Sequence, residues 1–326
     1  MPRVALLVLA GLVALAAGAQ GHAQAQTPWP TKPVKILVPT APGGTADALA
    51  RMYAQHLGKV LGQQFYVENR GGAGNVLGID SVVRSPADGA TLLLGAGTIT
   101  INHLVTKKLP YDVLRDLTPV TQMISVPNVL VVNASQPMKS LKDYVTAAKA
   151  APGQLTYGSA GVGSNLHMAM ELLKYRTGIE VTHVPYKGVG PALQDTLAGH
   201  VMSMIANIPS SKPHIDKGSL RALAVTSLKR SPALANVPTM SEEGVKDYEV
   251  LNWFGVFAPA GTPKEIVDRL AAEAAAMFAD PKTREMLTAE GADPIASSPA
   301  EFAAFVRAEI KKWDEVGKAA NIQPTE

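Results

Sequence analysis

Cysteine is absent from this sequence of 326 residues, which excludes disulfide bonds and a cysteine-linked lipid anchor. A packed core must therefore hold the fold, and longer chains can build one because they bury a larger fraction of their surface. A strong charge imbalance is also lacking, since 30 Lys and Arg oppose 27 Asp and Glu. This balance excludes nucleic-acid binding through a basic surface. With 47% hydrophobic and 17% charged residues, the composition is that of an ordinary globular protein.

Long apolar runs are lacking except at the N-terminus. There, Arg3 precedes an apolar stretch over residues 4–17, which is shorter than the about 20 residues that span a bilayer. Small and polar residues follow, with "AQA" ending at Ala25. This order is typical of a secretory signal peptide. We therefore expect residues 1–25 to be removed and the remaining chain to be exported as a soluble protein.

The rest of the chain has the pattern of an α/β protein. Short β-branched runs alternate with helical patterns from Val34 onward, which predicts mainly parallel sheets, and the length suggests two lobes. The pattern begins again after "LPYDVLRDLTPVTQM", and the extended segment "YEVLNWFGVFAPAGTP" is expected to return to the first lobe. We predict lobe 1 over residues 26–122 and 249–326, and lobe 2 over 123–248. The hinges are expected near 118–126 and 248–256.

Several helix starts carry local signals. "TPKE" at residues 262–265 and "SPAE" at 298–301 have the pattern of capping boxes with proline at the first helical position. An S-x-x-D start follows the same logic at Ser140. Trp313 lies in the last predicted helix and is expected to be a core or interface residue.

Two glycine-rich turns, "PTAPGGTADALA" and "YGSAGVGSNLHM", join a strand to a helix, one in each predicted lobe, with Thr45 or Ser164 at the expected N-cap. The free N–H groups and the dipole of a first helical turn can receive an anion, and glycine lets a ligand approach the backbone. "GSAGVGSN" has the spacing of a phosphate loop but lacks its lysine, which favours a carboxylate over a nucleotide. Each turn alone fits a tight connection that binds nothing equally well.

Catalytic and cofactor motifs are missing or incomplete. "YGSAG" has Tyr157 where a nucleophile elbow needs glycine, and "GGAGNVLG" is one residue too long for a dinucleotide fingerprint. His167 and Glu171 have a spacing compatible with metal ligation, but H-E-x-x-H is absent, so we expect an exposed His–Glu pair. We predict no catalytic residues, no metal and no cofactor.

Six motifs together resemble the Bug-type periplasmic solute receptors, the binding proteins of tripartite tricarboxylate transporters. They are "WPTKPVKILVPTAPGGTADALAR", "VENRGGAGNVLG", "LPYDVLRDLTPV", "YGSAGVGSNLHM", "HVPYKGVGPALQDTLAG" and "NWFGVFAPAGTP", in order over essentially the whole mature chain. The resemblance implies a two-lobed periplasmic-binding-protein fold of the second type with its ligand, usually an organic carboxylate, in the cleft between lobes. It also implies a monomer that delivers this ligand to the subunits of an integral-membrane permease.

By position in these motifs, the resemblance implies ligand contacts from one loop in each lobe and from two wall residues. They are Ala41, Gly43, Gly44, Thr45 and Asp47 in the first loop, Ser159, Ala160, Gly161, Gly163, Ser164 and Asn165 in the second, and Thr98 and Asn207 in the walls. Asp47 fits a role in stabilising its helix start equally well. Tyr186 and Lys187 are expected to flank the cleft, although Lys187 also fits a solvated loop charge.

The function predicted from these features is a periplasmic receptor that closes its lobes over a small carboxylate. Two alternatives stay open: a secreted enzyme acting on a carboxylated substrate, with Asp47 as the candidate acid or base, and a sensor that presents its ligand to a membrane kinase. Many relatives carry an aspartate near the position of Asn207, so the neutral amide here leaves the identity and charge of the ligand open.

Overall fold

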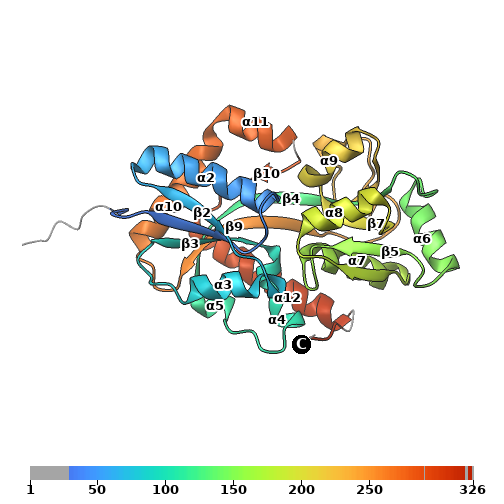
Figure 1. Cartoon of the computed structure of the whole chain (residues 1–326), viewed down its shortest axis with the longest axis horizontal. Helices are drawn as coiled ribbons and strands as arrows, with labels where there is room; N and C mark the ends of the chain where they lie inside the picture. The colour runs from blue at the N-terminus through green and yellow to red at the C-terminus, as the bar shows by residue number, and fades with distance from the viewer. Residues whose placement is uncertain (1–28, 290, 320–321, 325–326) are drawn as a thin grey trace, which may run out of the picture.

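The computed structural model describes residues 29–289, 291–319 and 322–324, so the predicted signal peptide at 1–25 lies outside the described residues. Two α/β lobes lie side by side and are joined by long strands that run between them (Figure 1). In the described part of the chain, no helix combines the length and the apolar character needed to cross a membrane.

The first lobe is a sheet with helices on both faces. β1 lies between β2 and β3 and is parallel to both. Successive side chains of a strand point to opposite faces. Here Ile36 packs in a cluster with α2 and α10 (Lys264–Ala279), while Leu37 packs with α3 and α12 (Pro299–Ala319). The elements before the crossing are β1 (Val34–Val38), α2 (Thr45–Leu61), β2 (Phe65–Asn69), η1 (Ala73–Asn75), α3 (Val76–Val83), β3 (Thr91–Ala96), η2 (Gly97–Thr100), α4 (Asn102–Val105) and α5 (Val113–Asp116).

The second lobe repeats this arrangement. β5 pairs in parallel with β6 and β7. Helices cover both faces, because Leu130 packs in a cluster with α6 and α7 whereas Val131 packs with α8 and α9. Its elements are α6 (Leu141–Ala150), β5 (Thr156–Ser159), α7 (Asn165–Thr177), β6 (Thr182–Pro185), α8 (Val189–Ala198), β7 (Ser203–Asn207), α9 (Ile208–Asp216), β8 (Leu220–Val225) and η3 (Pro232–Leu234).

The crossing is made by β4 (Leu117–Asn133) and β9 (Leu251–Pro259). β4 pairs with β9 over 117–127 and then, from Asn128 onward, with β7 and β8 of the second lobe. β4 thus changes its pairing partners after residue 127, later than the lobe boundary predicted after residue 122. The lobe boundaries themselves stay a prediction. The chain then returns through α10 (Lys264–Ala279), α11 (Pro281–Ala289), β10 (Asp293–Pro294) and α12 (Pro299–Ala319).

Two of the three capping boxes expected from the sequence are present. At α6, Ser140 and Asp143 bond each other's backbone N–H reciprocally, and Ser298 and Glu301 do the same at α12. The prediction for "TPKE" is wrong, because α10 has Pro263 as its N-cap. Thr262 instead donates its hydroxyl to the carbonyl oxygen of Pro259 at 2.8 Å, so the turn after β9 competes successfully for this side chain.

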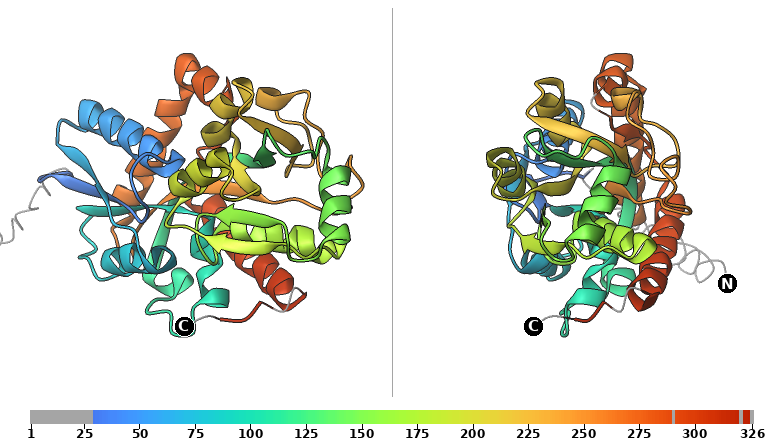
Figure 2. Two further views of the ribbon diagram at one scale, coloured as in Figure 1. Left: turned by 45° about the vertical axis from the view of Figure 1, so that its right-hand side comes forward. Right: turned by 90° about the vertical axis from the view of Figure 1, so that its right-hand side faces the viewer.

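The last helix, α12, extends from the first lobe to the side of the second (Figure 2). Its Trp313 is fully buried in the cluster that contains residues of α7, which confirms the expected core or interface role. The carboxylate of Glu309 accepts hydrogen bonds from the indole N–H groups of Trp253 (3.0 Å) and Trp313 (3.3 Å). This buried carboxylate therefore ties the crossing strand β9 to α12.

Candidate functional site

The candidate site lies where the carboxyl ends of parallel strands from both lobes face each other, which is where ligands bind in open α/β sheets. In the first lobe, the loop after β1 lies against the loop after β2. The Asn69 amide donates to the carbonyl oxygen of Thr40 at 3.3 Å, and a Cβ added to Gly71 would lie 3.5 Å from the backbone nitrogen of Ala41. The turns that follow these strands form one edge of the site.

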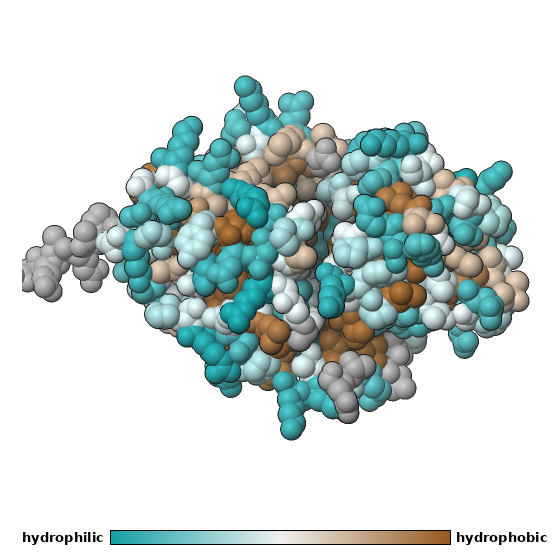
Figure 3. Space-filling view, viewed as in Figure 1, coloured by the Kyte–Doolittle hydropathy of each residue, from teal (hydrophilic) through white to brown (hydrophobic). Residues whose placement is uncertain are grey.

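The second-lobe loop approaches this edge closely. A Cβ added to Gly74 of η1 would lie 3.6 Å from the carbonyl oxygen of Val162. A Cβ added to Gly97 of η2 would lie 3.5 Å from the amide nitrogen of Asn165. The structure thus brings the predicted second loop against the turn that contains Thr98. Viewed from the same side as Figure 1, the surface is hollowed along the line between the lobes (Figure 3).

In the first-lobe loop, the helix start differs from the prediction. Gly44 is the N-cap of α2 and Thr45 is the first helical residue, so Thr45 makes no capping bond. Asp47, three residues after the cap, instead accepts the backbone N–H of Gly43 at 3.2 Å. A carboxylate at this position reaches back as in a capping box and complements the helix dipole. The Thr45 hydroxyl is therefore not needed to cap the helix.

Asp47 is also paired with Arg51 one turn further along α2. The Arg51 Nε donates to Asp47 Oδ2 at 3.1 Å, and its Nη2 lies 3.0 Å from Oδ1. Burial raises the pKa of the Asp47 carboxyl, but the hydrogen bonds from Arg51, Gly43 and Asn69 outweigh it and hold this pKa below its ordinary value. Asp47 therefore stays ionised at neutral pH and paired with Arg51, although its buried Oδ1 accepts no hydrogen bond.

The second-lobe loop is held by its own serines. Ser164 is the N-cap of α7, as predicted, and its Oγ accepts the backbone N–H of His167 at 3.2 Å. Ser159 is fully buried, and its Oγ accepts the N–H of Gly161 at 3.1 Å and lies 2.6 Å from Nε2 of His183. Ala160 and Gly161 are half-buried between these two anchors.

Two histidines lie beneath this loop. The rings of His167 and His183 stack with centroids 4.2 Å apart, and Tyr157 stacks on His183 at 4.8 Å. The expectation of an exposed His167–Glu171 pair is therefore wrong, because the imidazole packs against the other rings rather than solvent. Burial lowers the pKa of His167 to about 4 and that of His183 to about 3. Among the described residues, no cluster of His, Cys, Asp and Glu could hold a metal ion.

A chain of buried amides lies at the point where β4 changes sheets. Asn207 Nδ2 donates to Asn128 Oδ1 at 2.7 Å, and Asn128 Nδ2 donates to Asn165 Oδ1 at 3.1 Å. Asn165 Nδ2 in turn donates to the carbonyl oxygen of Leu251 on β9 at 3.2 Å. Asn165 and Asn207, both predicted to contact ligand, thus use their amides in this chain. We call these three residues the amide chain.

The structure adds residues that the sequence did not single out. Asn128 lies in strand sequence outside the six motifs, and His183 begins the motif "HVPYKGVGPALQDTLAG" but was assigned no role there. The loop "GGAGN" was detectable, because it follows β2 just as the two predicted loops follow β1 and β5. Asn102 links this loop to η2 when its amide is oriented to donate to the carbonyl oxygens of Gly74 and Thr98, each at 3.2 Å.

Tyr186 and Lys187 take different positions. The Tyr186 hydroxyl donates to Asp195 of α8 at 2.6 Å, and its ring packs on the second-lobe core, so this side chain is turned toward α8. Its carbonyl oxygen approaches the site, since a Cβ added to Gly161 would lie 3.1 Å away. Lys187 is exposed, as expected for a solvated loop charge.

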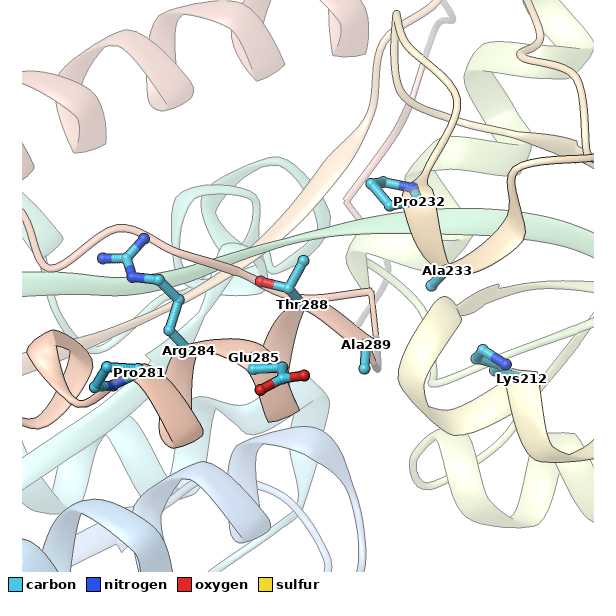
Figure 4. Close-up of a pocket in the computed structure, with 8 residues that line it drawn as sticks. All are labelled: Lys212, Pro232, Ala233, Pro281, Arg284, Glu285, Thr288 and Ala289. Carbon is cyan, nitrogen blue, oxygen red and sulfur yellow. The ribbon is translucent and has the colours of Figure 1, made fainter.

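A separate groove of about 610 Å³ lies between α9 and η3 of the second lobe and α11 of the first (Figure 4). β10, which follows α11, pairs with Ile124 and Ser125 of β4. These two residues also pair with β9, so β10 lies on the edge of β4 opposite to β9. β1 to β3 reach β4 through β9. The groove therefore lies across the crossing strands from the first-lobe loops, and it contains none of the predicted site residues. Its lining residues are Lys212, Pro232, Ala233, Pro281, Arg284, Glu285, Thr288 and Ala289.

Comparison with known proteins agrees with this geometry. Protein BugT of Bordetella pertussis is 38% identical over 310 residues, covering 94% of this chain and 95% of that protein. Rpa4515 of Rhodopseudomonas palustris, solved with adipate, superposes with a TM-score of 0.88 and 42% identity, covering 91% of this chain and 100% of that chain. MatC of the same organism, solved with malate, superposes with a TM-score of 0.84 and 33% identity, covering 88% of this chain and 99% of that chain.

These likenesses confirm the predicted α/β fold with two lobes of the periplasmic-binding-protein type. Residues 49–322 match the family described as "Tripartite tricarboxylate transporter family receptor". This match extends over both lobes and includes the loop after β5 and all three residues of the amide chain. The chain belongs to the receptor family of the tripartite tricarboxylate transporters.

Proposed function

We propose that this receptor binds a small organic carboxylate between its lobes and delivers it to a membrane permease. One observation carries the proposal: the N-termini of α2 and α7, one from each lobe, begin at glycine-rich turns on facing ends of parallel sheets. Free N–H groups and helix dipoles favour a negatively charged ligand at both turns. The relatives solved with adipate and malate support a carboxylate.

The ligand class follows from the charges at the site. Asp47 is the only charged side chain among the predicted contacts, and it is already paired with Arg51. The two histidines beneath the second loop are neutral at physiological pH. Recognition therefore relies on backbone N–H groups and hydroxyls, which suit a carboxylate better than a polyphosphate.

Closure and delivery follow from the two-lobed arrangement. A ligand that contacts both lobes binds the closed form more tightly than the open form and so shifts the equilibrium toward closure. We infer a periplasmic location from the family and from the signal-like sequence at 1–25. The closed form is then the state that a permease would recognise.

A thermal-shift screen of the chain from residue 26 onward tests the proposal. Adipate and malate come first, followed by other di- and tricarboxylates, aromatic acids, amino acids and nicotinamide-like amides. We expect at least one carboxylate to stabilise the protein, by about 2.7 kcal/mol at a hundredfold excess over its Kd. Stabilisation by uncharged compounds alone would contradict the proposal. Chromatography of the hit after incubation shows whether it is returned unchanged.

Asp47→Asn separates a receptor from an enzyme that uses Asp47 as acid or base. Asparagine keeps an acceptor for the Gly43 N–H but loses the ion pair with Arg51, so we expect the free energy of unfolding to fall by about 1 kcal/mol. Calorimetry should give a carboxylate affinity within about threefold of wild type. An enzyme dependent on this carboxylate would instead lose turnover by about a hundredfold or more.

A further inference from the structure

We propose that His167 and His183 are positioning residues for the ligand, which fix the second-lobe loop through hydrogen bonds made as uncharged imidazoles. This inference rests on the proposed function, because it assumes that the loop contacts the ligand. Both bonds end at the glycines of "GSAGVGSN": His167 bonds Gly163 directly, and His183 bonds Gly161 through Ser159. These glycines are where the backbone can come closest to a ligand.

The bond of His167 defines its protonation state. The backbone N–H of Gly163 donates to Nδ1 at 3.2 Å, so Nδ1 must carry a lone pair. The ring proton is then on Nε2, which lies 3.8 Å from the Glu171 carboxylate. Protonation of Nδ1 would set two N–H groups against each other and release Gly163. The geometry therefore requires an uncharged His167 in the Nε2–H tautomer.

His183 acts through Ser159. The Ser159 Oγ accepts the N–H of Gly161 at 3.1 Å and donates to the carbonyl oxygen of the same residue at 3.1 Å. With the hydroxyl proton used in this way, the contact of 2.6 Å with His183 is satisfied when Nε2 of His183 donates. Ser159 thus clamps Gly161, and His183 fixes the rotamer of Ser159.

Burial is the main cause of the low pKa of both rings, and the charge of Lys174 lowers it further, whereas the Glu171 carboxylate raises the pKa of His167. The titratable groups beside the two rings are Tyr157 on β5 and Glu171 and Lys174 on α7. Glu171 is the only carboxylate among them, and it already accepts the Tyr157 hydroxyl at 2.8 Å and Lys174 Nζ at 2.7 Å. Two stacked imidazolium ions 4.2 Å apart would repel each other, and Lys174 adds to that repulsion.

The same contacts argue against a serine nucleophile. Ser159 is fully buried, and its hydroxyl is used by the backbone of its own loop. Among the described residues, no carboxylate is bonded to His183, so the orienting group of a catalytic triad is missing. The Ser–His contact is better explained as part of the loop support.

Nitrogen-15 NMR of the histidine side chains tests the protonation states without a ligand. We expect His167 as the Nε2–H tautomer and both rings uncharged from pH 8 to pH 5. After correction for ligand ionisation, adipate affinity should be flat over the same range. A histidine in this pair that titrates above pH 6, or affinity that strengthens as the pH falls from 7 to 5.5, would overturn the inference.

Matched substitutions test the positioning role. Phenylalanine at either position keeps the ring stack and removes the hydrogen bond, so His167→Phe and His183→Phe should weaken adipate binding about three- to tenfold. His167→Asn keeps an acceptor near Nδ1, and His183→Gln keeps a donor near Nε2, so both should stay within about twofold of wild type. His200→Gln, on an exposed histidine of the same lobe, is the control.

Amide hydrogen exchange supplies a readout that does not depend on binding. The Gly163 amide should exchange faster in His167→Phe than in His167→Asn, and the Gly161 amide faster in His183→Phe than in His183→Gln. Wild-type exchange at these glycines in both phenylalanine variants would refute the inference even if a carboxylate binds. If the exchange and NMR results hold but wild-type protein binds no carboxylate, the proposed function fails, and the positioning role for a ligand fails with it.

Discussion

Asn128→Leu is expected to lower the free energy of unfolding by about 3 kcal/mol. Leucine keeps the branched shape of asparagine but is larger, because methyl groups replace the amide oxygen and nitrogen, so the change removes the hydrogen bonds and adds some overpacking. Asn128 is fully buried, and its loss leaves Asn165 Oδ1 and Asn207 Nδ2 without the bonds that it makes to them. An orphaned buried polar group costs about 1–3 kcal/mol. Urea unfolding measures the loss as a lower midpoint at unchanged slope.

A third partner of Asn128 limits the size of this effect. Asn128 Nδ2 also donates to the carbonyl oxygen of Val250 at 3.1 Å, but that oxygen accepts the Thr226 hydroxyl at 2.5 Å as well. Val250 therefore keeps a partner in the variant. The predicted loss comes from the other two members of the amide chain, which belong to the second lobe.

The double variant Asn128→Leu/Asn207→Leu is the control for this interpretation. Once Asn128 is gone, removing Asn207 eliminates an orphaned donor. The losses in free energy of unfolding of the two single variants should therefore sum to more than the loss in the double variant. Strictly additive losses, or a loss below about 1 kcal/mol for Asn128→Leu alone, would contradict a cooperative amide chain.

The amide chain also shows which parts of the site the sequence could predict. The two glycine-rich loops proposed to contact the ligand were predictable because strand, glycine turn and helix follow one another within a few residues. Asn128 lies within one continuous strand, and its partners Asn165 and Asn207 are 37 and 79 positions away. No local pattern reports such a contact. His183 was missed for the same reason, because its role depends on Ser159, 24 residues earlier.

The secondary structure differs from that expected from the sequence at positions where two local rules compete. Prolines normally interrupt strands, so local rules do not predict one continuous strand through Pro119 and Pro127. The structure places both in β4, where Pro119 pairs with Phe257 next to a register shift. At α2, both Gly44 and Thr45 suit an N-cap, and the choice depends on Asp47 reaching back to Gly43. Both outcomes are decided by contacts with neighbouring residues, and a local sequence pattern cannot tell which contact will form.

Gly163→Ala is expected to weaken carboxylate binding by about thirtyfold or more. Gly163 has φ +74°, and an added Cβ would lie 2.3 Å from Cγ2 of Val105 in the opposite lobe. The clash exists only when the lobes are this close, so opening relieves it at the expense of the closed state. A closed state disfavoured by about 2 kcal/mol reduces apparent affinity by about thirtyfold. Calorimetry measures the affinity, and small-angle scattering should show less compaction with ligand.

The other end of α7 supplies a matched control. Gly178 caps the C-terminus of this helix at φ +67°, and an added Cβ there meets no atom within 4 Å. Gly178→Ala therefore introduces backbone strain of the same kind without a contact between lobes. We expect it to cost about 1 kcal/mol of stability and to leave carboxylate affinity unchanged.

A second-site change distinguishes the clash from damage to the loop itself. In Gly163→Ala/Val105→Ala, both γ-carbons of Val105 are gone, and the nearest remaining atom is its Cβ, 3.2 Å from the added methyl group. Most of the lost affinity should then return, although the backbone strain at residue 163 remains. Restored affinity would mean that the approach of the loop to α4 is part of the ligand-bound state. Affinity that stays low in the double variant, with Val105→Ala alone like wild type, would mean that Gly163 acts through the loop conformation and not through closure.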